Sequence, residues 1–349
     1  MIHPDHKNTP MTTLTQSVLA GDRLSLARAL TQVENNTLAG QKILDALFPY
    51  TGKAHLIGIT GAPGTGKSTL VNQLALSFRK LEKRVAIVAV DPSSPFTGGA
   101  VLGDRVRMRD LSGDPGVFIR SMATRGSLGG LAQATVKIVQ VFDAAGYDVV
   151  IIETVGAGQS EVDVARLAHT TIVVEAPGLG DDIQAIKAGI LEIADILVIN
   201  KADHPGTEST EAALRNMLEL SHPVQKVFRH HDQTLSLAEP NPEKNPVTQS
   251  VDLWIPPICR TVATEGKGLP ALMEAIQNHL AYLHKFGDWV ARDQARLFSE
   301  FDLMLQSSLL EDFRARIPAG KIEQVKNSLQ NRQISPQEAV NVLLNINRL

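Results

Sequence analysis

The chain has 349 residues, with 34 Lys and Arg against 37 Asp and Glu, and therefore a formal net charge of −3. That length accommodates one large α/β domain with appendages, or two domains. The near balance of charge, without a long basic block, argues against a nucleic-acid-binding protein. The single cysteine, Cys259, excludes an internal disulfide and a multi-cysteine metal site, and it suits a reducing compartment. It lies in an apolar run, so we interpret it as a buried structural thiol.

Membrane and secretion signals are not found in the sequence. No uncharged apolar stretch reaches the roughly 18 residues that a transmembrane helix needs. The first residues lack the apolar core of a secretory signal peptide. We therefore expect a cytoplasmic protein that does not contact a membrane.

Residues 1–50 favour helices. Asp22 is placed to cap a helix that carries Leu24, Leu26 and Leu30, and a second apolar stripe runs over residues 38–48. We interpret this region as an N-terminal helical extension that packs on the domain following it.

A glycine-rich loop after residue 60 carries the clearest chemical signal. It reads G-x-x-x-x-G-K-S, follows the apolar run 56–59 and leads into residues 69–76, whose apolar side chains recur at helical spacing. Backbone N–H groups in such a strand–loop–helix unit form a positively polarised cup for phosphates. Lys67 would reach the β and γ phosphates, and the Ser68 hydroxyl would bind Mg²⁺. The predicted phosphate site comprises Gly61, Ala62, Pro63, Gly64, Thr65, Gly66, Lys67, Ser68 and Thr69.

Short apolar runs then alternate with helical patterns as far as residue 284. Strands are predicted over residues 85–90, 117–120, 147–156, 171–174, 196–199 and 258–262, with helices over 131–145, 183–194 and 208–220. This alternation is typical of a mostly parallel sheet covered by helices on both faces. We predict an α/β P-loop NTPase domain over residues 51–284, interrupted by a polar, proline-containing excursion at 222–253 with at most one short strand near 225–228.

Carboxylates at strand ends are candidates for Mg²⁺ binding. Glu153 ends the apolar strand expected nearest the phosphate loop, and Asp91 and Asp104 lie in or after the 85–90 strand end. Asp91 and Asp104 could equally be loop caps. Gly156 is placed to contact the γ-phosphate, but Ala157 follows where Ras-like GTPases carry a catalytic Gln. We therefore expect slow unaided hydrolysis.

An N-K-x-D sequence after the 196–199 strand indicates the base. The carboxylate of Asp203 can accept both the N1–H and the N2–H₂ of guanine, which adenine cannot offer, while Asn200 and Lys201 brace the base-binding loops. This pattern favours GTP over ATP. Ala263 and Thr264 would close over the base from the next strand end.

Two further segments leave alternatives open. Residues 175–187 follow a strand and are glycine-rich and acidic, which fits either a connector with a helix cap or a third nucleotide-responsive segment. Beyond residue 270, helices are predicted over 272–283, 288–316 and 321–329, and a capping box at Ser335-Pro336-Gln337-Glu338 begins a last one. Its apolar face, with Ala339, Val342, Leu343 and Ile346, could fold back on the sheet domain; a dimer arm over residues 285–349 is favoured.

With these residues assembled, the chain resembles the MeaB/ArgK family of GTPases, which includes methylmalonic aciduria type A proteins, in the SIMIBI class. The likeness covers almost the whole chain. Its longest motifs are V-D-P-S-S-P-F-T-G-G-A-x-L-G-D-R-x-R-M, E-T-V-G-x-G-Q-S-E, A-P-G-x-G-D-D-I-Q-A-x-K-A-G and N-K-A-D.

The resemblance implies a homodimer built through the C-terminal arm. It also implies a chaperone that uses GTP to gate cofactor loading of adenosylcobalamin-dependent methylmalonyl-CoA mutase and to protect that enzyme. By the same resemblance, the segments of Asp91 and Asp104 correspond to a first switch, residues 153–161 to a second, and residues 176–187 to a third. Lys187 is then a candidate for partner-stimulated hydrolysis.

Two rival functions remain open at this stage. Some SIMIBI GTPases are chaperones for nickel or another metal, although the single cysteine argues against that role here. Relatives have also been named as kinases of an arginine or ornithine transport system, but no phosphoacceptor site is evident in the sequence.

Overall fold

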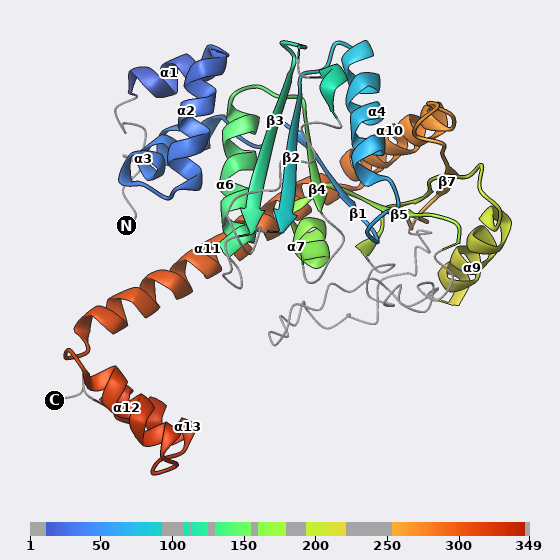
Figure 1. The fold of residues 1–349 in the computed structure, drawn as a ribbon. Helices are drawn as coiled ribbons and strands as arrows, with labels where there is room; N and C mark the ends of the chain where they lie inside the picture. The colour runs from blue at the N-terminus through green and yellow to red at the C-terminus, as the bar shows by residue number, and fades with distance from the viewer. Residues whose placement is uncertain are drawn as a thin grey trace, which may run out of the picture. The chain divides into compact units, whose positions relative to one another are not determined.

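The computed structural model describes residues 12–92, 108–111, 113–124, 130–154, 160–178, 193–220 and 253–345 (Figure 1). The strand predicted near residues 225–228 and most of the helix predicted over 183–194 lie outside these ranges.

The core of the protein is a seven-stranded sheet in which every strand pairing is parallel. The strand order is β3-β2-β4-β1-β5-β6-β7. The strands are β1 (His55–Thr60), β2 (Val85–Pro92), β3 (Val117–Thr124), β4 (Val149–Thr154), β5 (Thr170–Glu175), β6 (Ile196–Ile199) and β7 (Ile258–Arg260). This architecture confirms the predicted α/β P-loop NTPase class. It also places β1, which leads into the phosphate loop, in the centre of the sheet, between β4 and β5.

Helices cover both faces of the sheet, as Figure 1 shows. They are α4 (Lys67–Lys80), η2 (Arg109–Leu111), α6 (Gly130–Ala144), α7 (Ser160–Leu167), α9 (Thr207–Leu220) and α10 (Leu269–Phe286). Successive strand residues point to opposite faces. Leu56 of β1 accordingly packs in a core with Phe142 of α6, whereas Ile57 packs in a second core with Leu70 of α4 and Leu272 of α10.

The N-terminal helices pack against the β3 side of the sheet. They are α1 (Thr13–Leu19), α2 (Arg23–Glu34) and α3 (Leu38–Leu47), followed by η1 (Phe48–Tyr50). Asp22 caps α2 as predicted, because its carboxylate accepts the Ser25 N–H at 2.7 Å. Arg23 donates to the Val117 carbonyl of β3 at 2.7 Å, and Arg120 of β3 donates to Glu34 at 3.0 Å. These contacts cover the edge strand.

Several element boundaries differ from the sequence prediction, and three of these differences have an evident physical reason. Helix α10 begins at Leu269 instead of residue 272, because Pro270 is tolerated in a first helical turn. Strand β7 ends at Arg260, since the chain then turns back and Val262 pairs antiparallel with Lys267. Strand β3 continues to Thr124, in register with β2 along its whole length. Cys259 of β7 is buried, and burial raises the pKa of its thiol to about 11, as expected of a structural cysteine.

The chain divides into two compact units, residues 1–293 and 294–349. Helix α11 (Asp288–Arg316) has the predicted bounds and passes from the first unit into the second, which also contains α12 (Lys321–Gln330) and α13 (Pro336–Asn345). The predicted capping box is present, because the Glu338 N–H donates to Ser335 Oγ at 3.2 Å and the Ser335 N–H donates to Glu338 at 2.8 Å. Ala339 is buried, Val342 is exposed, and Ile346 lies outside the described residues. The predicted domain limits at residues 50 and 284 stay a prediction.

Buried polar side chains gather where β1, β5 and β6 begin. We call His55, His169, Asp195, His279 and Arg292 the amino-edge cluster. Asp195 accepts two hydrogen bonds from the Arg292 guanidinium of α11, both at 2.9 Å, and lies 3.3 Å from Nε2 of His279. Although burial by itself raises the pKa of Asp195, the hydrogen bonds from His279 and Arg292 hold that pKa well below its usual range.

His55 is the strongly shifted base of this cluster. Its Nε2 lies 2.7 Å from the Thr170 hydroxyl, which in turn lies 2.9 Å from Nδ1 of His279. Burial, followed by the charges of His279 and His284, lowers the pKa of His55 from 6.5 to about 3, and the nearby Asp195 opposes this shift. His55 is therefore neutral in the folded protein at neutral pH.

We predict that acid destabilises the fold through His55. Between its unfolded and folded pKa values the ring binds a proton only in the unfolded chain, so stability is present above about pH 6.5 and is lost as the pH falls. This one group lowers the free energy of unfolding by about 1.4 kcal/mol per pH unit. Denaturant unfolding at a series of pH values measures the slope, which His55→Gln should reduce by that amount. His204→Gln, which changes an exposed histidine, serves as the control, and an unchanged slope in His55→Gln would contradict the assignment.

Candidate nucleotide-binding site

The loop between β1 and α4 is built so closely against its neighbours that two of its glycines are required. Gly61 has φ 137°, and a Cβ there would lie 2.0 Å from the Val174 carbonyl oxygen of β5. Gly66 has φ 91°, and its Cβ would lie 2.4 Å from Nδ2 of Asn200. The loop is therefore held against β5 and the loop after β6, while Pro63 and Gly64 are exposed at its tip.

Lys67 begins α4 and folds back over the loop. Its Nζ donates to the carbonyls of Gly61 at 2.8 Å and Ala62 at 2.9 Å, and the side chain is buried. The Thr65 hydroxyl also donates to Ala62, at 3.0 Å. Ser68 and Thr69 follow in the first turn of α4, where backbone N–H groups lack partners within the helix. Positive charge and backbone N–H donors thus gather at the carboxyl end of β1, as anion binding requires.

Ser68 and Glu153 meet across the strand ends. The Ser68 hydroxyl donates to Oε1 of Glu153 at 2.5 Å, and Glu153 is buried near the end of β4, in register with Ile59 of β1. One residue further along each strand, the Thr154 hydroxyl donates to the Thr60 hydroxyl at 3.1 Å. This buried bridge ties the residue before the phosphate loop to the residue after Glu153.

The remaining predicted metal and switch residues are only partly described. Asp91 lies near the end of β2, in register with Ala123 of β3, and its side chain is outside the described part of the chain. Asp104 and Lys187 lie outside the described residues altogether, as do residues 155–159 with Gly156 and Ala157. The segment 175–187 is described only as far as Gly178.

Asn200, directly after β6, connects two loops. Its Nδ2 donates to the Thr65 carbonyl of the phosphate loop at 2.8 Å. Its Oδ1 accepts from the Thr261 hydroxyl and from the Ala263 N–H, both at 3.1 Å. Lys201 has φ 56° and donates to the Gly64 carbonyl at 2.8 Å. The pair therefore braces the phosphate loop as well as the turn after β7.

Asp203 lies in the same loop as Asn200 and Lys201, at a solvent-exposed position. Its side chain is half exposed, and the Ala202 N–H donates to the Thr261 carbonyl at 3.0 Å, which brings the loop of Asp203 beside the turn at 261–267. Thr264 is exposed on that turn, and Ala263 is buried against Asn200. The predicted base-binding residues thus come from two adjacent strand ends, with the carboxylate accessible.

Several threonines of the site are not among the residues predicted from the sequence. Thr60 and Thr154 each end a buried apolar strand, and Thr261 directly follows β7. A buried hydroxyl needs a hydrogen-bond partner, so a threonine at the end of an apolar run predicts that such a partner lies nearby. The partners themselves depend on strand order, which the sequence does not give.

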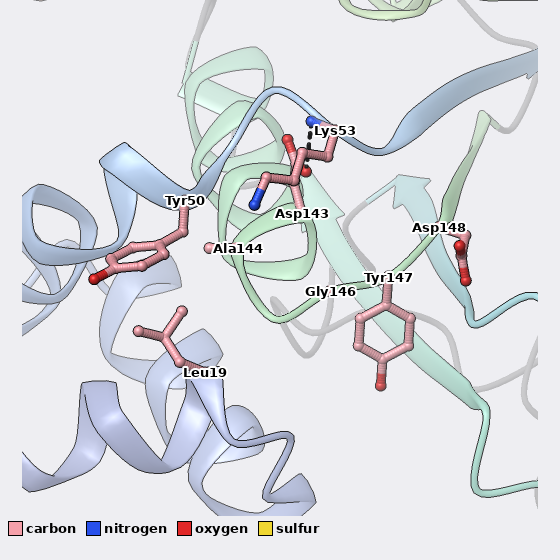
Figure 2. Close-up of a pocket in the computed structure, with 8 residues that line it drawn as sticks. All are labelled: Leu19, Tyr50, Lys53, Asp143, Ala144, Gly146, Tyr147 and Asp148. Atoms are coloured by element: carbon pink, nitrogen blue, oxygen red, sulfur yellow. Dashed lines mark hydrogen bonds between the residues drawn. The ribbon is translucent and has the colours of Figure 1, made fainter.

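A cavity of about 460 Å³ lies away from the phosphate loop (Figure 2). Leu19 and Tyr50 contribute to its lining, together with the segment from Asp143 to Asp148 that precedes β4. The carboxylate of Asp143 accepts the N–H groups of residues 52, 53 and 54 at 2.6 to 3.1 Å. Asp143 therefore holds the chain entering β1, which is a structural role.

None of the helices in the described part of the chain combines the length and apolarity needed to cross a bilayer. In the same ranges, no three His, Cys, Asp or Glu side chains are grouped as metal ligands.

Comparison with known proteins identifies the family. Residues 26–317 match the family model described as methylmalonyl Co-A mutase-associated GTPase MeaB. A putative GTPase of Pyrococcus abyssi is 42% identical over 95% of this chain and 95% of its own length, and GTPase ArgK of Escherichia coli is 39% identical over 73% and 72%. The crystal structure of a LAO/AO transport system kinase superposes with a TM-score of 0.68 at 27% identity, covering 96% and 97% of the two chains. The chain belongs to the MeaB family of GTPases.

Proposed function

We propose that the protein is a cytoplasmic GTP-hydrolysing switch that loads or protects an adenosylcobalamin-dependent methylmalonyl-CoA mutase. Family membership supports guanine nucleotide binding and an association with such a mutase. The observation that carries the nucleotide assignment is the position of Asn200, which joins the phosphate loop to the proposed base-binding turn. One nucleotide could then contact both loops at the same time.

We further propose that the nucleotide binds with Mg²⁺. The Ser68 hydroxyl and the Glu153 carboxylate are oxygen donors that already lie 2.5 Å apart, and oxygen ligands are those that Mg²⁺ prefers. Asp91 and Asp104 are proposed as further donors, directly or through water. The ion would supply neutralisation of charge on the phosphates. Lys67 would exchange the carbonyls of Gly61 and Ala62 for phosphate oxygens.

Asp203 is proposed to select guanine. Because hydrogen bonds to a charged group contribute about 1.5–3 kcal/mol, Asp203→Ala should weaken GDP binding by about 10- to 100-fold. Binding of ADP, which cannot form these bonds, should remain weak and unchanged. Isothermal titration calorimetry measures both affinities, and Asp45→Ala, the same change at an exposed position of α3, is the control. Equal affinities of the unmodified protein for GDP and ADP would rule out this role.

Hydrolysis is proposed to be slow alone and faster with the mutase. Ala157 follows Gly156 where other GTPases supply a water-positioning Gln, so the missing function must come from a partner or from a responsive segment. Lys187 is carried over from the family resemblance as the residue of that segment which supports the faster rate.

This role predicts the fate of the γ-phosphate. With γ-labelled GTP, label should appear as free phosphate, slowly for the protein alone and faster with a cobalamin-dependent mutase. Lys187→Ala should keep the slow rate and lose the acceleration. Lys137→Ala, which removes a hydrogen bond between α6 and Asn36, should keep both. Full acceleration in Lys187→Ala would refute the role of that lysine. Label on a protein would favour a transport-system kinase.

We propose that residues 285–349 form a dimer arm attached to a GTPase domain at 51–284, with residues 1–50 as a helical extension. Within the second unit, α11 exposes Phe298, Phe301, Leu305 and Leu309, at 66, 61, 44 and 60% of their surface. Spacings of three, four and four residues place these side chains on one stripe. A contiguous apolar stripe of this kind is unfavourable in water, and a second copy of the chain would cover it.

The dimer is tested by its mass in solution. Sedimentation equilibrium should give twice the chain mass for the unmodified protein and a single chain for the double variant Phe301→Glu, Leu305→Glu, because burying two carboxylates in an apolar interface is strongly unfavourable. Gln330→Glu adds a charge at an exposed position of α12, outside this stripe, and should leave the dimer intact. A monomeric unmodified protein would contradict the proposal.

A further inference from the structure

The amino-edge cluster holds the first turns of α11 on the sheet. Besides its two bonds to Asp195, Arg292 donates to the His169 carbonyl at 2.7 Å. The Trp289 ring stacks on the ring of His169 with 3.8 Å between centroids, and Nε2 of His169 lies 4.0 Å from the Asp293 carboxylate. These contacts join α11 to the starts of β5 and β6. The proposed phosphate and base chemistry does not use them.

Strand β6 connects this cluster to the nucleotide site by a very short path. Asp195 immediately precedes β6 and Asn200 immediately follows it, and the four strand residues between them are all buried. Because a strand rises about 3.3 Å per residue, the backbone positions of Asp195 and Asn200 are roughly 16 Å apart. Because β6 is paired with β5 on one side and β7 on the other, it is constrained to move as a rigid segment.

The two ends of β6 carry different kinds of contact. At the carboxyl end, Asn200 binds the carbonyl of Thr65, and Lys201 binds that of Gly64. A nucleotide that reorders the loop must alter these bonds. At the amino end, the paired bonds between Asp195 and Arg292 depend on the mutual orientation of two planar groups. A small displacement of β6 would therefore be converted into a change at the base of α11.

We propose that β6 is a relay through which the state of the nucleotide site changes the contact between Asp195 and the Arg292 turn of α11. This inference rests on the proposed nucleotide binding and adds a route by which that binding reaches the first turns of α11. Nucleotide binding and the geometry of the contact at Asp195 would then change together, because both depend on the position of β6.

The protein contains its own reporter of this cluster. It has two tryptophans, Trp254 and Trp289. The Trp254 indole N–H donates to the Asp195 carbonyl at 2.8 Å, and Trp289 stacks on His169. Intrinsic tryptophan emission therefore comes from side chains that contact the cluster. Trp254→Phe leaves Trp289 as a single probe at the base of α11.

The test uses the full chain with Trp254→Phe as background. Emission spectra and acrylamide quenching are measured without nucleotide, with GDP and Mg²⁺, and with a non-hydrolysable GTP analogue and Mg²⁺. Calorimetry on the same samples measures nucleotide affinity independently. Arg292→Lys keeps the charge but cannot form the paired bonds, so it is less disruptive than Arg292→Met, and circular dichroism checks that it folds. Arg316→Lys makes the same change at an exposed position of α11 that pairs with Asp312.

We expect the emission or quenching of Trp289 to differ between nucleotide states, in the background protein and in Arg316→Lys. In Arg292→Lys this difference should be lost while GDP affinity is retained. Binding by calorimetry with no nucleotide-dependent change at Trp289 would overturn the relay and leave the proposed function intact. A difference that persists in Arg292→Lys would also overturn it. Absence of nucleotide binding by calorimetry would overturn both the proposed function and the relay, since the relay depends on a bound nucleotide.

Discussion

The side-chain amide of Asn200 is the contact on which the arrangement of the site depends. It is buried at the end of β6, donates to the phosphate loop and accepts from the turn after β7. Both ends of the amide are satisfied, which is required of a buried polar group and makes the geometry specific. A loop that contains three glycines would otherwise have few conformational constraints. Here it is held by Asn200 and Lys201 on one side and by the close approach of Gly61 to β5 on the other.

Polar chemistry lies at both ends of an apolar sheet. At the carboxyl ends of the strands, Lys67, Ser68, Glu153 and Asn200 converge at the loop. At the amino ends of β1, β5 and β6 lies the amino-edge cluster, where the buried Asp195 carboxylate pairs with the Arg292 guanidinium. Strands of four to six residues separate these groups. A short, fully paired strand is stiff, so the two ends are not mechanically independent.

Much of the fold could be predicted from the sequence because its signals are local. Buried parallel strands read as continuous apolar runs, and the helix over residues 288–316 and the cap at Ser335 follow from spacing and side-chain type. Errors occurred where local signals compete. The helix predicted over residues 272–283 begins earlier, at Leu269, because Pro270 fits in its first turn. The end of β7 at Arg260 depends on a turn in which Val262 pairs with Lys267.

For the site, sequence alone determined the residue types and their place at strand ends: the phosphate loop, the carboxylate of Glu153 and the N-K-x-D sequence. These patterns are contiguous in the chain, so neighbouring residues suffice to recognise them. Only the tertiary structure decided which strand ends are neighbours. Ser68 meets Glu153 85 residues away, Asn200 meets Thr65 135 residues away, and Asp195 meets Arg292 97 residues away. Such contacts depend on the strand order and on the packing of the first turns of α11 near the starts of β5 and β6. The spacing of residues along the chain predicts neither of these features.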